Sequence, residues 1–143
     1  MPNFNFGMLF LVLASWQAFP AASAERTVTQ VILDGAGLDS DIDDASLTEN
    51  CKTFKPTVSQ VKRYFSKAYP IESRILTHER YSPCFANGEV SFSDNTSGRF
   101  RLYSGGTATL FWLGGNTVDL LYKGNKWHDP FACAYGLSDE PEC

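Results

Sequence analysis

The sequence is poor in charge and lacks long apolar runs beyond its first residues. Of 143 residues, 20% are charged and the formal net charge is −4, which excludes the composition of a disordered chain. Glycine occurs only 11 times, and neither a collagen period nor a lasting heptad pattern is present. The single long apolar run lies at the N-terminus, which excludes a polytopic membrane protein. The length fits one domain.

The first 24 residues contain no charged side chain. An apolar run at residues 8–14 is followed by Pro20 and by the small residues at 22–24. This order is typical of a secretory signal peptide with an A-x-A cleavage site, and the run is shorter than the about 20 residues of a membrane anchor. We therefore expect cleavage of residues 1–24, secretion or export to the periplasm, and no membrane span in residues 25–143.

Cysteine is scarce but even in number. The four cysteines form no C-x-x-C pair, and the nearest two are ten positions apart, so a zinc site is not indicated. Exported cysteines pair as disulfides, and four of them allow three connectivities. We favour Cys51 with Cys84 and Cys133 with Cys143, because the second bond would hold the C-terminal tail.

Residues 57–69 carry the clearest helix pattern. Thr57 and Gln60 have the spacing of a capping box, which satisfies amides at a helix N-terminus. Apolar residues then recur at intervals of three and four, as on one face of a helix. They are Val58, Val61, Phe65 and Ala68. Ser46 and Glu49 have the same capping-box spacing, which predicts a short helical turn there.

The other periodic segments alternate with a period of two or are rich in β-branched residues, which predicts strands. These segments are residues 27–33, 73–79, 89–93, 99–103, 107–113 and 117–123. The connections among the last of them, such as Gly105 and Gly106, are too short for a parallel crossover. We expect one α+β domain, an antiparallel meander of four to five strands packed on the 57–69 helix and stapled by disulfides.

Charges of opposite sign are separated along the chain. Residues 25–50, with one predicted strand, carry seven acidic and one basic side chain; residues 51–127 carry eleven basic and five acidic; residues 128–143 carry four acidic and no basic. Either the acidic segments neutralise the basic body of the domain, or a basic face meets an anionic partner surface. No nucleic-acid-binding motif is present, so nucleic acid is not an expected partner.

Catalytic candidates are few. The only two histidines each precede a carboxylate, His78 before Glu79 and His128 before Asp129. Either imidazole could act as a general base, and together with a carboxylate they could hold a metal ion. The G-x-S-x-G nucleophile motif is absent. A small periplasmic hydrolase or metal-dependent enzyme is therefore the alternative function, and no cofactor is expected.

Asp39, Asp41 and Asp43 have the spacing with which calcium loops begin. The rest of that pattern fails, because Asp44 stands where glycine is needed and Asn50 where glutamate is needed. A solvated acidic loop is the preferred interpretation, and a weak calcium site is the alternative.

Recognition of a protein is the preferred function. Interface anchors are enriched in tyrosine, tryptophan and arginine. Two places concentrate such residues, the 78–81 segment and the outward row of the strand at 99–103. The candidates are Arg80, Tyr81, Arg99, Arg101 and Tyr103. We expect an exported binding module, such as an inhibitor or immunity-type protein that neutralises a partner enzyme.

Overall fold

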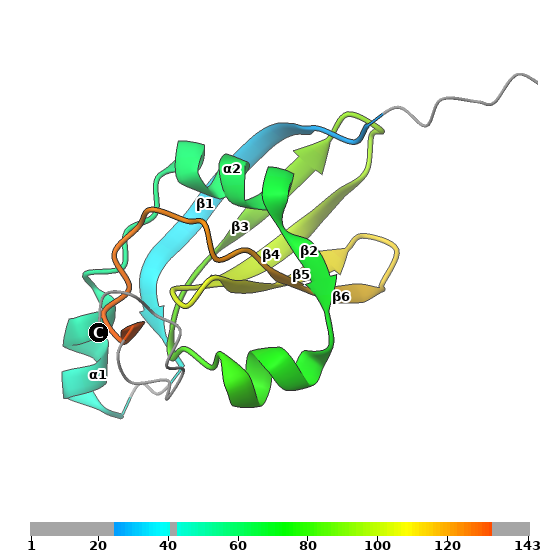
Figure 1. The fold of residues 1–143 in the computed structure, drawn as a ribbon. Coiled ribbons are helices and arrows are strands. Elements are labelled where there is room, and N and C mark those ends of the chain that lie inside the picture. The colour runs from blue at the N-terminus through cyan, green and yellow to red at the C-terminus, as the bar shows by residue number, and fades with distance from the viewer. Residues whose placement is uncertain (1–24, 41–42, 133–143) are drawn as a thin grey trace, which may run out of the picture.

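A computed structural model describes residues 25–40 and 43–132. The strands in this part of the chain are β1 (Val28–Asp39), β2 (Tyr69–Ile71), β3 (Cys84–Phe92), β4 (Ser97–Tyr103), β5 (Thr107–Trp112) and β6 (Thr117–Leu121). The helices are α1 (Ala45–Cys51), α2 (Val58–Lys67) and a short π-helix, η1 (Ile75–Glu79). All strand pairs are antiparallel, and they form one sheet in the order β1-β3-β4-β5-β6-β2 (Figure 1).

The structure combines an antiparallel sheet with helices, as the α+β prediction expected, but the sheet has six strands instead of four or five. β3 to β6 form the predicted meander, and β1 extends it at one edge. The other edge is β2, where the helix was predicted to end. Three residues that include Pro70 carry no alternation, which is why this strand was missed. An edge position tolerates the proline.

The predicted strand at 73–79 is wrong, because this segment is helical and ends in η1. Its closing bond runs from the Arg80 amide to the Ile75 carbonyl, at 2.8 Å. Ile75 and Leu76 are adjacent apolar residues, so the segment cannot alternate as a half-buried strand does. A helical turn instead buries Leu76 and leaves the polar residues at 77 and 78 exposed.

Helix α2 confirms the predicted helix and its cap. The Thr57 amide donates to Gln60 Oε1 at 2.8 Å, and the Gln60 amide donates to Thr57 Oγ1 at 3.2 Å. The buried stripe differs slightly from the predicted one: Tyr64 is fully buried, whereas Val58 is 48% exposed. In α1 the predicted cap is wrong, because the N-cap is Asp44, two residues before Ser46, and its carboxylate accepts from the amides of Ser46 and Leu47.

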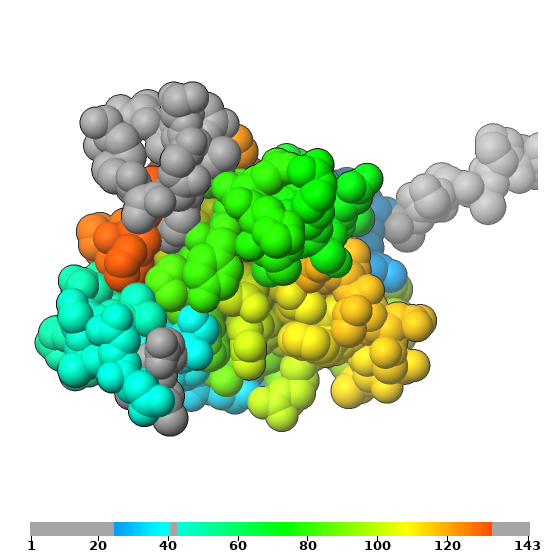
Figure 2. All heavy atoms as spheres, turned by 90° about the horizontal axis from the view of Figure 1, so that it is seen from below, coloured from blue at the N-terminus to red at the C-terminus, as the bar shows by residue number. Residues whose placement is uncertain are grey.

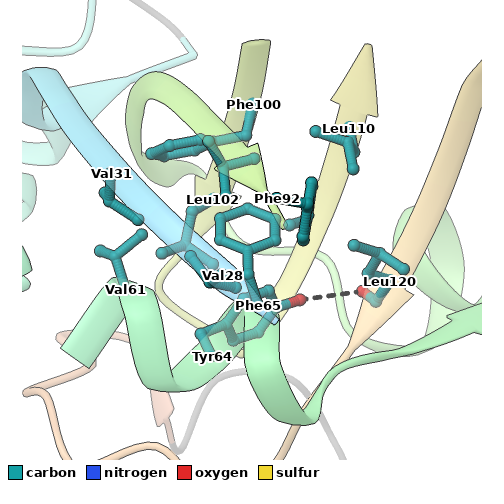
Figure 3. Packing of buried hydrophobic residues seen from close by; sticks show 12 residues of the cluster. Val28, Val31, Val61, Tyr64, Phe65, Phe92, Phe100, Leu102, Leu110 and Leu120 are labelled. Carbon is teal, nitrogen blue, oxygen red and sulfur yellow. Dashed lines mark hydrogen bonds between the residues drawn. The ribbon is translucent and has the colours of Figure 1, made fainter. Parts of the chain in front are cut away.

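The main core lies between α2 and the inner face of the sheet. Phe65 of α2 packs on Phe100 of β4, with ring centroids 5.0 Å apart. The Tyr64 hydroxyl reaches across this layer and donates to the Leu120 carbonyl of β6 at 3.2 Å (Figure 3). The buried hydroxyl therefore keeps a partner, as burial of a polar group requires.

A second, smaller core surrounds a disulfide. Cys51 at the end of α1 is bonded to Cys84 at the start of β3, and both are fully buried. This confirms the first predicted pairing. The second pairing, Cys133 with Cys143, lies outside the described residues, as does the predicted signal peptide of residues 1–24. Among the described helices, none is long and apolar enough to cross a membrane.

Candidate functional site

The two faces of the sheet are covered differently. α2 packs on the inner face, whereas much of the outer face over β1, β3, β4 and β5 is exposed (Figure 1). Antiparallel register places outward side chains of neighbouring strands side by side. We call this set the open face; it comprises Ile32, Asp34, Phe85, Asn87, Glu89, Arg99, Arg101, Tyr103, Thr109 and Phe111.

The helical segment with η1 borders the open face at one end. It lies on the opposite side of the strands from α2, below them in Figure 1. Thr107 and Leu121 point outward by strand alternation, yet they are 0% and 5% exposed. Seen from below, strand residues from cyan to yellow reach the surface between α1 and the β5–β6 hairpin, with η1 in green along one side (Figure 2). The exposed area is therefore bounded by α1, the segment with η1 and the β5–β6 hairpin.

Arg101 is the central cation of the open face. It is exposed, and its guanidinium carbon lies 4.5 Å from the centroid of the Phe85 ring on β3. Phe85 in turn packs on Tyr103, with ring centroids 6.2 Å apart. Stacking on an aromatic ring restricts the arginine rotamers while leaving its N–H donors available. The three side chains form a partly ordered unit that faces solvent.

Arg99 is partly neutralised by its neighbours. Its Nη2 lies 3.3 Å from Asp34 Oδ2 on β1, and it stands opposite Glu89 in the β3–β4 register. Both members of the ion pair are well exposed, so the pair adds little to stability. The pair instead places charges of both signs near Arg101. A partner must therefore match a mixed pattern of charge and not a single sign.

Two large apolar side chains extend the open face. Phe111 of β5 is 44% exposed and pairs with Arg99 across the strands, and Ile32 of β1 is 45% exposed and pairs with Glu89. Single exposed apolar residues are ordinary. Here they accompany Arg101 and the Phe85–Tyr103 pair on one sheet surface, a composition typical of interface cores.

A shallow hollow of about 200 Å³ lies within the open face between Arg99, Arg101 and Phe111. Asn87 also lines it, and Asn87 Oδ1 is a buried acceptor with no hydrogen-bond partner among the described residues. Such an acceptor costs roughly 1–3 kcal/mol when it stays unpaired. Asn87 therefore keeps one acceptor that the described part of the fold leaves unsatisfied.

Arg80 is the predicted binding residue that the structure moves to the interior. It is only 5% exposed, and its Nε and Nη2 donate to the Gly105 carbonyl at 3.2 and 2.9 Å. The prediction of a surface anchor is wrong here, because η1 turns this side chain toward the β4–β5 hairpin. Tyr81 is 49% exposed, and its hydroxyl lies 3.0 Å from Ser40 Oγ beyond the end of β1.

The histidine–carboxylate pairs are arranged differently from the enzyme hypothesis. His78 is exposed on η1, while Glu79 forms an ion pair with Arg74 at 2.7 Å. His128 is exposed, and Asp129 Oδ1 accepts from the Ser104 hydroxyl at 2.7 Å. Both carboxylates are thus bonded to groups other than an imidazole.

No group of three His, Cys, Asp or Glu residues in the described ranges could hold a metal ion. The aspartates of the predicted calcium loop are described only in part, since Asp39 and Asp43 are included and Asp41 lies outside. The weak calcium site stays a prediction.

A buried polar network was missed by the sequence reasoning. Ser82 Oγ lies 2.5 Å from Ser104 Oγ, which donates to Asp129, and the Trp127 indole donates to the Ser104 carbonyl at 2.8 Å. Both serines are nearly inaccessible, at 1% and 2% exposed. A nucleophile must reach its substrate. The network instead fastens the segment after β6 to the β4–β5 hairpin.

Phe85 and Asn87 were also missed, because the strand was predicted to begin at Glu89. In the structure residues 85–92 alternate without interruption between half-buried or exposed and buried positions, and the buried positions of the first half hold the small residues Ala86 and Gly88. Gly88 obscures this alternation, since glycine reads as a breaker. A Cβ at this position would collide with the Ile32 carbonyl oxygen, so glycine is required for the close approach of β1.

Comparison with protein-family models, curated proteins and solved structures finds no match for this chain. The residues of the open face are therefore the basis on which a function is proposed.

Proposed function

We propose that the protein is a small exported binding module that recognises a protein partner through the open face, as an inhibitor or immunity-type protein does. One observation carries this proposal: the exposed side of the sheet presents Arg101 stacked on Phe85 together with exposed Phe111 and Ile32. Arginine is enriched among the few residues that carry most of the binding energy at protein interfaces, and aromatic residues are enriched in interfaces generally.

Rigidity favours the open face over the charged surface of α2. Lys62 and Arg63 of the helix are exposed long side chains that must be ordered on binding. Arg101 already rests on a ring that is held by the sheet. A side chain ordered beforehand loses less entropy when a partner binds. The two surfaces therefore differ in the entropy that binding costs.

The charge pattern specifies the partner's chemistry. Arg101 calls for an acidic group, while Phe111 and Ile32 call for apolar contacts in the adjacent cross-strand row. Asp34 and Glu89 beside Arg99 would repel a uniformly acidic surface. The partner we propose is thus a protein with an acidic side chain inside an apolar patch, and not a uniformly anionic polymer or membrane.

The disulfide supports an exported location. Cys51 and Cys84 are fully buried and bonded, and such bonds persist in oxidising compartments. The enzyme alternative, by contrast, has no supporting observation among the described residues, where Glu79 and Asp129 are bonded to Arg74 and Ser104.

Affinity capture from the native envelope or culture medium tests the proposal. The baits are the wild type, an Arg101→Ala/Phe111→Ala variant of the open face, and a Lys62→Ala/Arg63→Ala variant of α2 as the control. We expect one protein to be captured by the wild type and the control and to be lost from the open-face variant. Equal capture by all three, or loss from the control alone, would contradict the proposal.

Inhibition is tested separately once a partner is captured. If the partner is an enzyme, its activity should fall when the wild-type protein is added and should persist with the Arg101→Ala/Phe111→Ala variant. Circular dichroism and a melting curve establish that each variant is folded. A captured enzyme that keeps full activity would leave a binding module without an inhibitory role.

A further inference from the structure

A cavity of about 340 Å³ opens on the inner face of the sheet, where α2 ends and β2 begins. Its walls are apolar side chains from both layers of the domain, including Phe65 of α2, Phe92 of β3 and Leu110 of β5. In Figure 3, Phe65, Phe92, Leu110 and Leu120 approach one another across this region. We call this cavity the inner chamber. Its size is at the lower end of the range for small-molecule sites.

A second cavity, of about 310 Å³, adjoins the first. Arg26 and Trp112 line both cavities, so these two side chains form the boundary between them. The remaining wall of the second cavity comes from the β3–β4 and β5–β6 turns and combines the polar side chains of Asn95, Thr96 and Ser97 with the apolar Leu113. We call it the outer chamber. The two chambers thus differ in the polar side chains that the turns add to the wall of the outer one.

The boundary carries no net charge. The Arg26 guanidinium lies 5.3 Å from the Phe92 ring and 5.2 Å from the Trp112 ring, and its Nε donates to Asp94 Oδ2 at 2.7 Å. The hydroxyl of Thr96, and more weakly Arg26, lower the pKa of Asp94, so this carboxylate is ionised at neutral pH. The negative charge of Asp94 therefore balances the positive charge of Arg26.

Arg26 still has donors to offer. Only its Nε has an acceptor within the described part of the chain, and its side chain is 46% exposed. A guanidinium has further N–H groups on its two Nη atoms. A ligand oxygen at the boundary could accept from them without bringing a charge of its own, because Asp94 supplies the counter-charge.

We infer that the two chambers form one site for a small uncharged amphiphile. Its alkyl body occupies the inner chamber, and its hydroxyl-bearing head occupies the outer chamber beside Arg26. A carboxylate head would place a second anion close to Asp94, and a cationic head would face Arg26 itself. The apolar walls provide the affinity, and the polar turns select the head group.

Isothermal titration of the exported protein with n-octyl β-glucoside, below its micelle concentration, tests this site. Octanoate and octyltrimethylammonium serve as anionic and cationic ligands with the same chain. We expect saturable binding of the glucoside and about tenfold weaker binding of both charged ligands. Absence of saturable glucoside binding, or tighter binding of octanoate, would overturn the inference.

Filling the inner chamber locates the ligand. Leu110→Phe and Ala68→Phe add volume from the sheet and from the end of α2, and Ile32→Phe on the open face is the matched control. We expect each filling variant to weaken glucoside binding about tenfold or more, and the control to bind as the wild type does.

Ala68 is only half-buried, so the Ala68→Phe variant decides the test if Leu110→Phe does not fold. Unchanged glucoside binding by a folded Ala68→Phe protein would overturn the location. As an independent readout, tryptophan emission should shift on binding in the wild type and lose that shift in Trp112→Phe. A shift that persists in that variant would also place the ligand elsewhere.

Discussion

On β4 the two faces of the sheet can be compared residue by residue. Phe100 and Leu102 are 2% and 0% exposed, whereas Arg99 and Arg101 beside them are exposed. Phe100 packs on Phe65 of α2, whereas Arg101 lies on Phe85 of β3 and Arg99 pairs with Asp34 of β1. The inner face thus contributes the buried area on which stability depends, and the outer face can carry side chains suited to binding.

The largest expected effect is on the inner face. Phe100→Ala should lower the free energy of unfolding by about 3–5 kcal/mol, because it removes a buried ring and leaves a cavity under α2. Urea unfolding followed by circular dichroism measures it. A loss below about 1 kcal/mol would mean that this position is not part of a packed core.

Removal of the disulfide comes next. The Cys51→Ala/Cys84→Ala variant opens a cross-link with a sequence separation of 33, which should cost about 3–4 kcal/mol. Once folded, the variant should still bind the partner, since neither cysteine belongs to the open face. Urea unfolding and the capture assay check both parts. Lost capture by a fully folded variant would contradict the division between the two faces.

Tyr64 gives a smaller effect that depends on pH. Burial raises the pKa of its hydroxyl well above the ordinary value, with further contributions from Asp119 and Tyr69. Unfolded tyrosine ionises near pH 10. The contribution of protonated Tyr64 to the free energy of unfolding is therefore complete below about pH 10. It is lost as the pH rises further, because Tyr64 releases its proton in the unfolded chain before it does so in the folded one.

Tyr64→Phe should cost about 1 kcal/mol at neutral pH, through the lost bond to Leu120, and should flatten the fall in stability above about pH 10. Urea unfolding at several pH values measures both. Tyr81→Phe, which changes a 49% exposed side chain, is the control and should leave the slope unchanged. An equal slope in Tyr64→Phe and wild type would show that Tyr64 does not ionise differently on unfolding.

The smallest effect on stability is expected on the open face. Arg101→Ala should change the free energy of unfolding by within about 0.5 kcal/mol, although its guanidinium lies on the Phe85 ring. Partner capture should nevertheless fall, and wild-type capture should weaken as salt rises. A loss above about 2 kcal/mol would assign Arg101 a structural role.

The sequence predicted the helices and strands that are marked by neighbouring residues, such as a cap or an alternation. The capping box of Thr57 and Gln60 marked α2, and the alternation at 99–103 placed Arg99 and Arg101 on one side of a strand. β2 and η1 were missed, since short segments depend on the sheet and the core that they join. The cross-links of a chain are likewise set by the fold, and only the Cys51–Cys84 pairing was both predicted and described.

The open face could be predicted only along β4. Contacts across strands depend on register, and β1 has irregularities on both sides of Gly35 that bring Asp34 near Arg99. No local pattern contains such a shift. Arg80 illustrates the opposite error. A charged side chain is expected at the surface, but a hydrogen bond to the Gly105 carbonyl holds this one in the interior.

Hydroxyl-radical footprinting of the protein with and without its captured partner tests the central claim most directly. Phe111 on the open face and Tyr69 on β2 are 44% and 51% exposed, so both should be oxidised in the free protein. We predict that the partner protects Phe111, together with Phe85 and Tyr103, while Tyr69 stays reactive. Protection of Tyr69 with Phe111 still oxidised would contradict the assignment of the open face as the binding surface.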